Sequence, residues 1–223
     1  MDRGAPRVLS QRMDRIDLTP AEPFSALIFD CDGTLAETAP LHYHACSNAM
    51  ATFGAVMPRP WYMARVGLSL VELMAAFEAD FGVRLDPQAV RLAAVPFYAG
   101  GFAKVREVTA VTAVARRYAG RVPMAVASGG HRDNVENTLR ALGLAGLFAA
   151  VVTIEDVGHG KPAPDLFLQA ARRLRVPPAA CVVFEDTDQG LEAARRAGMA
   201  ARDVRAACRP EGGVTRRGLV RRP

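Results

Sequence analysis

One short stretch of the sequence constrains the fold more than any other, an apolar run that ends in two acids. Ala26–Phe29 is apolar, Asp30 and Asp32 follow with one residue between them, and Gly33 comes next. A run of this length that ends in polar residues and glycine is typical of a buried strand that stops at the edge of a sheet. Ligands bind at the carboxyl edge of open α/β sheets, and two carboxylates held this close need a cation, a proton or hydrogen bonds. The stretch therefore marks a candidate site, although two solvated acids at the end of a strand would give the same pattern.

Predicted strands and helices alternate in the second half of the chain. With the first strand included, strands are predicted at residues 25–30, 122–127, 149–153, 180–184 and 200–204. Helices are predicted at residues 108–118, 133–142, 164–174 and 189–197. Strands that alternate with helices in this way form a parallel sheet with helices on both faces. We therefore expect an α/β fold with a doubly wound, Rossmann-like parallel sheet.

A helical pattern separates the first predicted strand from this region. Between residues 40 and 104 the apolar residues recur at helical spacing. One such set shares a face of the first predicted helix and consists of Leu41, Ala45, Ala49 and Phe53. The expected organisation is a loose N-terminal extension (1–23), an α/β core (24–38 and 105–204), an inserted helical domain (39–104) and a basic, disordered, dispensable tail (205–223).

The net charge of +5 does not indicate a nucleic-acid partner. Residues 205–223 contain six Arg and one Glu, so residues 1–204 carry 22 basic and 22 acidic side chains and balance to zero. A nucleic-acid-binding domain concentrates its basic excess on one face of the fold instead. No apolar run approaches the roughly 20 residues of a membrane span, and the four cysteines are scattered, as is usual for reduced thiols in the cytoplasm. We therefore expect a cytoplasmic monomer with neither a nucleic-acid nor a membrane partner.

Two further loops carry residues that can bind an anion. Ser128 and Gly129 follow the strand at 122–127, where a hydroxyl and the N–H groups at a helix start can bind an anion. Taken alone, Ser128 is better interpreted as a helix cap. Lys161 lies in a Gly-Lys-Pro loop, which lacks the Ser or Thr that follows the lysine of a nucleotide-binding P-loop. Only Lys104 and Lys161 are lysines among the 28 basic residues. Because the ammonium group is a compact point charge that arginine does not reproduce, we ask of each lysine whether it has a role that arginine could not fill.

A second acidic cluster follows the strand at 180–184. Glu185 and Asp186 offer the hard oxygen ligands that Mg²⁺ prefers, although solvated acids at a helix start are an alternative. Because parallel strands end at one edge of the sheet, all of these strand ends should meet there. The predicted ring consists of Asp30, Asp32, Ser128, Lys161, Glu185 and Asp186.

This arrangement resembles the signature of the haloacid dehalogenase superfamily of hydrolases. Its motifs occur in the family's order: Asp30-Cys31-Asp32-Gly33-Thr34, Ser128, Lys161 in Gly-Lys-Pro-Ala-Pro-Asp, and Glu185-Asp186. The helical insert is similar to the cap of the β-phosphoglucomutase-like subgroup. Within that subgroup, the segments that end at Ser128 and Asp186 resemble the bacterial fructose-1-phosphate phosphatases.

The resemblance implies a Mg²⁺-dependent phosphatase that acts on a small phosphorylated sugar. Asp30 would be the nucleophile that forms an aspartyl-phosphate, and Asp32 would be the general acid and then the general base. Mg²⁺ would be held by Asp30, the carbonyl of Asp32, Glu185 and Asp186. The residues expected to contact the phosphate or the substrate are Thr34, His42, Ser128, Gly129 and Lys161.

Several alternatives stay open at this point. His42 matches a cap position that faces the acid/base aspartate in the family, but an ordinary helix-surface histidine would look the same. A sugar-phosphate mutase needs a cap cation for the distal phosphate, and this chain has Leu70 and Ala94 at the positions of the mutases' Arg and Lys, with Arg65 as a candidate substitute. A signalling receiver domain, or a non-catalytic binding protein on the same fold, would fit the motifs less well.

Overall fold

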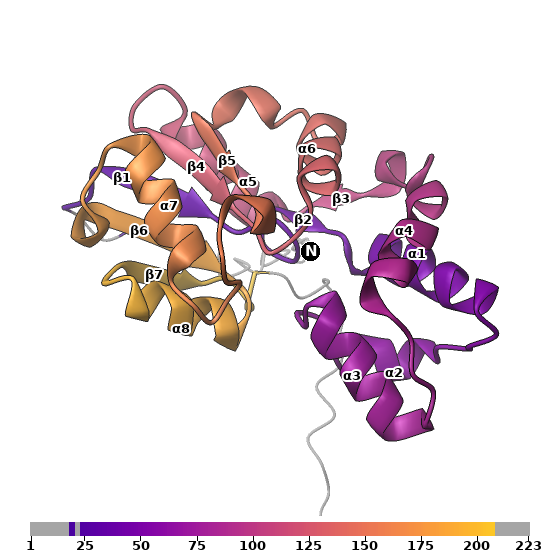
Figure 1. The fold of residues 1–223 in the computed structure, drawn as a ribbon. Helices are drawn as coiled ribbons and strands as arrows, with labels where there is room; N and C mark the ends of the chain where they lie inside the picture. Colours follow the sequence, from indigo (N-terminus) through magenta and orange to yellow (C-terminus); the bar gives the residue numbers. More distant parts are fainter. Residues whose placement is uncertain (1–17, 21–22, 208–223) are drawn as a thin grey trace, which may run out of the picture.

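A parallel sheet forms the centre of the protein in the computed structural model, which describes residues 18–20 and 23–207 (Figure 1). Its strands are β1 (Ala26–Phe29), β4 (Met124–Ala127), β5 (Ala150–Val152), β6 (Cys181–Glu185) and β7 (Ala200–Asp203). They pair in the order β5-β4-β1-β6-β7, and every pairing is parallel. β1 is therefore the central strand. The predicted doubly wound α/β fold is confirmed, and each predicted strand lies within two residues of its expected bounds.

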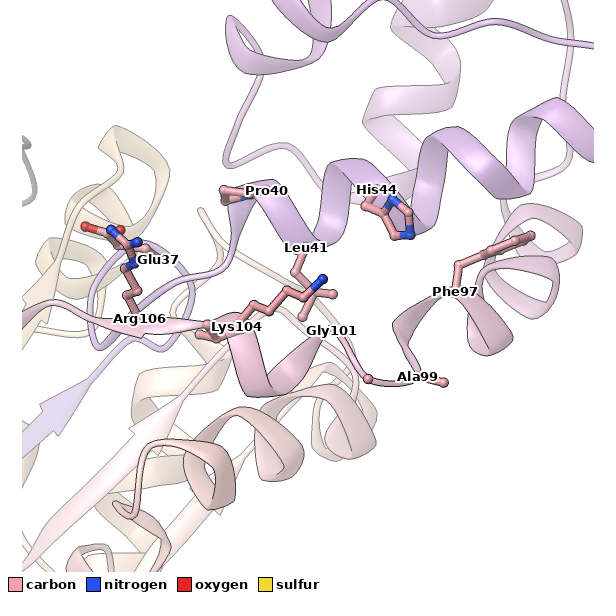
Figure 2. Close-up of a pocket in the computed structure, with 11 residues that line it drawn as sticks. Glu37, Pro40, Leu41, His44, Phe97, Ala99, Gly101, Lys104 and Arg106 are labelled. Atoms are coloured by element: carbon pink, nitrogen blue, oxygen red, sulfur yellow. The ribbon is translucent and has the colours of Figure 1, made fainter.

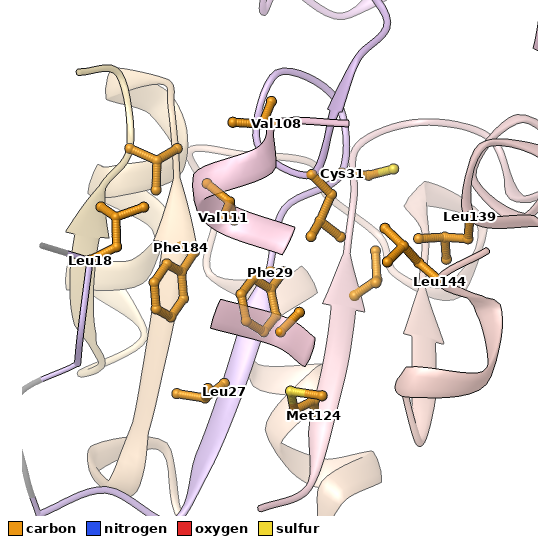
Figure 3. Packing of buried hydrophobic residues seen from close by; sticks show 14 of the residues in the cluster. Leu18, Leu27, Phe29, Cys31, Val108, Val111, Met124, Leu139, Leu144 and Phe184 are labelled. Carbon is orange, nitrogen blue, oxygen red and sulfur yellow. The ribbon is translucent and has the colours of Figure 1, made fainter. Parts of the chain in front are cut away.

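Helices cover both faces of the sheet. The four that follow the strands are α5 (Thr109–Tyr118), α6 (Arg132–Ala141), α7 (Asp165–Leu174) and α8 (Asp188–Arg196). Since side chains alternate along a strand, Leu27 and Phe29 face one side, where they pack with α5 and α6 (Figure 3). Ala26 and Ile28 face the other side, where they pack with α7 and α8. Both faces of β1 are fully buried, which explains why its sequence is apolar without a break.

The helical insert lies beside the sheet and has its own core (Figure 1). Its helices are α1 (Ala39–Thr52), α2 (Arg59–Met63), α3 (Leu70–Phe81) and α4 (Pro87–Tyr98). The start of α3 is fixed by a capping box, in which Ser69 and Glu72 satisfy each other's backbone N–H groups. The two chain segments that connect the insert to the sheet pair with each other as β2 (Ala36–Glu37) and β3 (Arg106–Glu107). These strands were not predicted, because two residues are too few to show a periodicity.

Short 3₁₀ helices complete the described elements. They are η1 (Phe102–Lys104), η2 (Ala145–Leu147), η3 (Ile154–Asp156) and η4 (Pro178–Ala180). None of the described helices is long and apolar enough to cross a membrane. The division of the chain into a core and an insert at residues 39 and 104 stays a prediction.

The structure corrects three expectations about exposed or loose residues. Within the extension predicted for residues 1–23, Leu18 is buried in the core and Arg202 donates a hydrogen bond to the carbonyl of Thr19. At the start of the predicted tail, Arg205 pairs with Asp203, so this residue is part of the fold. Phe53 is 47% exposed rather than buried with the helix face to which it was assigned. The remaining extension and tail lie outside the described residues.

Candidate active site

The order of the strands brings the predicted site residues together at one edge of the sheet. Asp30 follows β1, and Ser128 follows β4, which pairs with β1 on one side. Glu185 is the last residue of β6, which pairs with β1 on the other side. Gly33, with a φ of 88°, turns the chain directly after the two acids that follow β1. The carboxyl ends of three neighbouring strands therefore supply one site, as expected for an open α/β sheet.

Lys161 reaches into the middle of a buried acidic cluster. Its Nζ lies 2.5 Å from Asp30 Oδ1 and 2.6 Å from Glu185 Oε2. One carboxylate oxygen from each of Asp30, Glu185 and Asp186 lies within 4.8 Å of the other two. Asp30 and Glu185 are buried and only 10% of the Lys161 side chain is exposed. The scarce lysine is thus a paired charge inside the site rather than a solvated loop residue.

Glu185 is held by four donors. Its Oε1 accepts hydrogen bonds from the backbone N–H groups of Asp186 and Thr187 and from the Thr187 hydroxyl, at 3.1, 3.0 and 2.8 Å. Its Oε2 accepts from Lys161. Gly190 packs against the same carboxylate so closely that a Cβ there would lie 2.0 Å from Glu185 Cδ. The position of this carboxylate is therefore fixed by the start of α8.

The charges in the cluster perturb one another. Burial raises the pKa of Asp30 well above its ordinary value, and the neighbouring carboxylates add to this, while Lys161 opposes it. Burial and the charge of Glu185 raise the pKa of Asp186 to about 6. Burial by itself would lower the pKa of Lys161, but the charges of Asp30 and Glu185 outweigh burial and raise it. One ammonium thus compensates the three carboxylates only in part.

The residues present fit a hard divalent cation. Three carboxylates at this spacing are the oxygen donors that Mg²⁺ takes, usually together with water and phosphate oxygens. Thr34 Oγ1 donates to Asp186 Oδ1 at 2.9 Å, and a Cβ on Gly33 would lie 2.3 Å from Asp186 Oδ2. The turn after β1 therefore holds Asp186 in place. The acidic cluster is present as predicted, and Mg²⁺ itself stays a proposal.

Asp32 faces a different set of partners. Its Oδ1 lies 2.9 Å from His42 Nε2, and its Oδ2 accepts a hydrogen bond of 3.3 Å from the Ser128 hydroxyl. Ser128 Oγ in turn accepts from the backbone N–H of Gly130 at 2.9 Å. A Cβ on Gly130 would lie 3.1 Å from Asp32 Oδ2, so glycine permits this close approach. The two acids of the first motif thus have separate surroundings.

A tyrosine orients the histidine that contacts Asp32. Tyr98 Oη lies 2.9 Å from His42 Nδ1. Burial raises the pKa of Tyr98, so its hydroxyl stays protonated. With Nδ1 held by this hydroxyl, the ring of His42 presents its Nε2–H to Asp32 in both its neutral and its protonated form. His42 is therefore part of the site and not an ordinary surface histidine.

The partners of Asp32 also set its charge. Burial alone would raise the pKa of Asp32, but the charge of His42 and hydrogen bonds from His42, Thr38 and Ser128 outweigh burial and lower the pKa to about 2. Asp32 is thus ionised in this arrangement. Its neighbour Cys31 points to the other side of the strand and is fully buried in the core, as predicted.

One predicted contact differs from expectation. Thr34 was expected at the phosphate, but it is fully buried and its hydroxyl donates to Asp186, so we reassign it to positioning that acid. Gly129, which follows Ser128, is exposed. Tyr98 and Thr187 were missed as site residues. The position of Thr187 before a helix was a usable signal, because the residue caps α8, whereas nothing local links Tyr98 to His42.

The insert closes over this edge of the sheet. Gln189 Nε2 donates to Glu72 Oε1 at 3.3 Å, and a Cβ on Gly67 would lie 3.1 Å from Thr187 Cγ2. A cavity of about 240 Å³ lies between residues 64–68 of the insert and residues 187–189 of the core. Loop residues of the insert therefore border the approach to the acidic cluster.

Comparisons with known proteins agree with this geometry. The family model for haloacid dehalogenase-like hydrolases matches residues 24–198. The chain is 38% identical over 193 residues to the fructose-1-phosphate phosphatase YqaB of Escherichia coli, and the match covers 82% of this chain and 98% of that protein.

Solved structures of similar fold include a CbbY protein and a putative β-phosphoglucomutase. CbbY from Rhodobacter sphaeroides in complex with phosphate superposes with a TM-score of 0.72 at 28% identity, over 80% of this chain and 85% of that one. A putative β-phosphoglucomutase from Thermotoga maritima superposes with a TM-score of 0.61 at 26% identity, over 78% and 82%. The family and its phosphatase-named relatives support a phosphoric monoester hydrolase. Since both the family model and a relative of this similarity span most of the chain, the protein belongs to the haloacid dehalogenase-like hydrolases.

Proposed function

We propose that the protein is a Mg²⁺-dependent phosphatase that hydrolyses a small phosphorylated sugar through an aspartyl-phosphate on Asp30. The observation that carries the proposal is the buried carboxylate of Asp30, 2.5 Å from the Lys161 ammonium and within the cluster formed with Glu185 and Asp186. A carboxylate attacks a phosphate dianion only where positive charge offsets their repulsion. In this site the Lys161 ammonium supplies one positive charge beside Asp30, and the acidic cluster offers oxygen ligands for a divalent cation that would supply more.

In the first step, an oxygen of Asp30 attacks phosphorus and the bond to the sugar oxygen breaks. Asp32 gives its proton to the leaving oxygen. Contact with His42 favours the ionised form of Asp32, whereas the dianion of a bound substrate raises the pKa of the same carboxyl and favours its acid form. Lys161, which lies beside Asp30, and Ser128, which lies beside Asp32, would donate to the phosphoryl oxygens.

In the second step, Asp32 takes a proton from water, and the water attacks the phosphorus of the aspartyl-phosphate. The bond between Asp30 and phosphorus breaks, so that inorganic phosphate leaves and the carboxylate is restored. His42 orients Asp32 throughout, because Tyr98 fixes the imidazole. When held by Asp30, Glu185, Asp186 and the Asp32 carbonyl, Mg²⁺ would supply further positive charge for the phosphoryl group.

The insert supports a phosphatase over a mutase. A mutase must hold the distal phosphate of a bisphosphate with a cap cation. Arg65, the candidate substitute, is engaged inside the insert, with its Nη2 2.7 Å from Asp80 Oδ2 and its guanidinium 4.3 Å from the centre of the Trp61 ring. At the positions that align with the Arg and the Lys of the mutases, this chain has the apolar Leu70 and the buried Ala94. Without a cation that binds the distal phosphate, a bisphosphate intermediate would dissociate, and water would take the phosphoryl group from Asp30.

Turnover of an aryl phosphate tests the reaction. We expect many turnovers with Mg²⁺ and none above background after chelation with EDTA. Asp30→Asn should lose at least about 10³-fold in kcat, because the amide cannot act as the nucleophile. Single-turnover phosphate release without further cycles would indicate a phospho-accepting switch, and no release at all would indicate a binding protein. Near-normal activity in Asp30→Asn would refute the proposed mechanism.

A substrate panel tests the sugar. Ketose and hexose monophosphates should give the highest kcat/KM, whereas nucleotides and phosphoproteins should react poorly. In a second assay, β-glucose 1-phosphate with a trace of the 1,6-bisphosphate should yield free phosphate faster than glucose 6-phosphate. The reverse order would establish a mutase and contradict the assignment of Arg65.

A further inference from the structure

One cavity in the described part of the chain lies away from the acidic cluster. Its volume is about 520 Å³, within the range of ligand sites in proteins. It lies between the start of α1, the end of α4 and the segment from Ala99 to Arg106, which leads back to the sheet (Figure 2). None of the residues assigned to catalysis lines it.

The cavity lies on the opposite side of α1 from the active site. His42 contacts Asp32, whereas His44 lines the cavity. Two residues along a helix are about 200° apart around its axis, so these side chains point in nearly opposite directions. A ligand in the cavity would therefore not reach the acidic cluster.

Lys104, the lysine that the catalytic site does not use, lines this cavity, and its side chain points toward the end at which His44 lies (Figure 2). The structure gives the Lys104 ammonium no hydrogen bond or ion pair with any described residue. Asn48 Nδ2 lies 3.3 Å from His44 Nδ1. With the amide donating to Nδ1, the neutral ring of His44 carries its proton on Nε2. This end therefore offers a cation and an N–H donor, which is the chemistry that binds a phosphate.

The other end of the cavity is polar but not cationic overall. Glu37 and Arg106 lie there side by side (Figure 2), and they are register partners in the β2–β3 pairing. A carboxylate and a guanidinium together accept from and donate to hydroxyl groups. The apolar side chains of Pro40, Leu41 and Phe97 also line the cavity.

The glycines of the connecting segment shape this space. Gly100 has a φ of 71°, a conformation that favours glycine, and a Cβ on Gly101 would lie 2.3 Å from Leu41 Cδ1. The segment therefore runs close to α1 and leaves Lys104 at the wall of the cavity. A ligand there would touch both chain segments that join the insert to the sheet.

From this arrangement we infer that the cavity is a second binding site, for a small polyol phosphate whose phosphate lies at Lys104 and His44 and whose hydroxyls lie at Glu37 and Arg106. The site is separate from the proposed catalytic reaction and does not depend on it.

The scarcity of lysine makes a direct test feasible. Reductive methylation with ¹³C-formaldehyde labels the exposed Lys104 and the N-terminal amine, whereas Lys161 is buried in the active site. The NMR signal that disappears in Lys104→Arg is assigned to the labelled Lys104. The full chain with Asp30→Asn serves as the background, so that the probe, glycerol 3-phosphate, is not consumed. We expect the Lys104 signal to shift saturably with a Kd below about 1 mM.

Matched variants show where the probe binds. His44→Gln and Arg106→Gln should weaken binding at least about fivefold, since each removes a donor to the ligand. Arg121→Ala, an exposed cation outside the cavity, should leave the Kd unchanged. Glycerol alone should cause no shift, and inorganic phosphate should bind more weakly than glycerol 3-phosphate.

Four results would overturn the inference. The first is a Lys104 shift that stays linear up to about 20 mM glycerol 3-phosphate, and the second is a Kd that the cavity variants do not change. The third is equal affinity for inorganic phosphate. The fourth is loss of the Lys104 shift in Ser128→Ala while the cavity variants retain it. The last result would show that the signal reports occupancy of the active site.

Discussion

Replacing Gly190 with alanine tests how the active site is built, because this glycine lies against the carboxylate of Glu185. The new Cβ would lie 2.0 Å from Glu185 Cδ and 2.1 Å from Oε2. The buried Glu185 side chain would have to move by more than an ångström, since real contacts of this kind lie beyond 3 Å. Such a displacement breaks its ion pair with Lys161, at 2.6 Å, and its hydrogen bonds at the start of α8.

The expected loss of stability and of kcat follows from these contacts. Breaking a buried, hydrogen-bonded ion pair costs about 3–5 kcal/mol. For a chain of this length, that loss corresponds to a fall in Tm of about 10 °C. The kcat for an aryl phosphate should fall at least about 10²-fold, because Lys161 loses the partner that positions it at Asp30. Thermal unfolding followed by circular dichroism and initial-rate kinetics measure the two effects.

A double-mutant cycle separates the clash from any general effect on α8. In Glu185→Ala, the atoms that the new Cβ would meet are gone, so Gly190→Ala should then raise stability by up to about 1 kcal/mol through helix propensity. Gly158→Ala is the matched control, because a Cβ there meets nothing within 4 Å. A Tm within about 2 °C of wild type for the Gly190→Ala single variant, less than 1 kcal/mol on this scale, would refute the reasoning.

Three other substitutions test single contacts. Lys161→Arg should reduce kcat to below about a third of wild type, because a planar guanidinium does not fit where a compact ammonium contacts two carboxylates. A higher kcat would show that Lys161 is a replaceable loop residue. Tyr98→Phe should lower kcat about three- to tenfold with unchanged Tm, because His42 loses the hydrogen bond that orients it toward Asp32. An unchanged kcat would show that the imidazole is held by packing alone. Ser69→Ala should lower the free energy of unfolding by about 1 kcal/mol, through loss of the α3 capping box, and urea denaturation would measure it.

Much of the fold was predictable because its signals are local. The apolar runs of β1 and β6 and the helices between the strands follow from periodicity and from glycine or proline at their ends. Two-residue strands such as β2 and β3 carry no such signal. The burial of Leu18 was also missed, because a single apolar residue among charges shows no periodicity, and only the tertiary structure reveals that it packs in the core.

The composition of the site was predictable, but its contacts were not. Strand ends gave Asp30, Ser128 and Glu185, because a parallel sheet collects them at one edge. The hydrogen bond between Tyr98 and His42 joins residues 56 positions apart, and the sequence does not show that they meet. Thr34 shows the same limit, since its place in the first motif suggested a phosphate contact and its hydroxyl donates to an acid 152 positions away.

The charge balance of the site explains why its residue types occur together. Asp30, Glu185 and Asp186 bring three negative charges, and Lys161 offsets one of them. The upward shifts in the pKa of Asp30 and Asp186 express the same imbalance, because burial and mutual repulsion disfavour the charged forms. A net charge of minus two is what one divalent cation neutralises, and it would repel a phosphate dianion if left uncompensated. Asp32 lies outside this balance, since His42 and Ser128 satisfy it separately. In the proposed reaction, Asp32 would therefore gain and lose a proton while the acids that would hold a cation stay ionised.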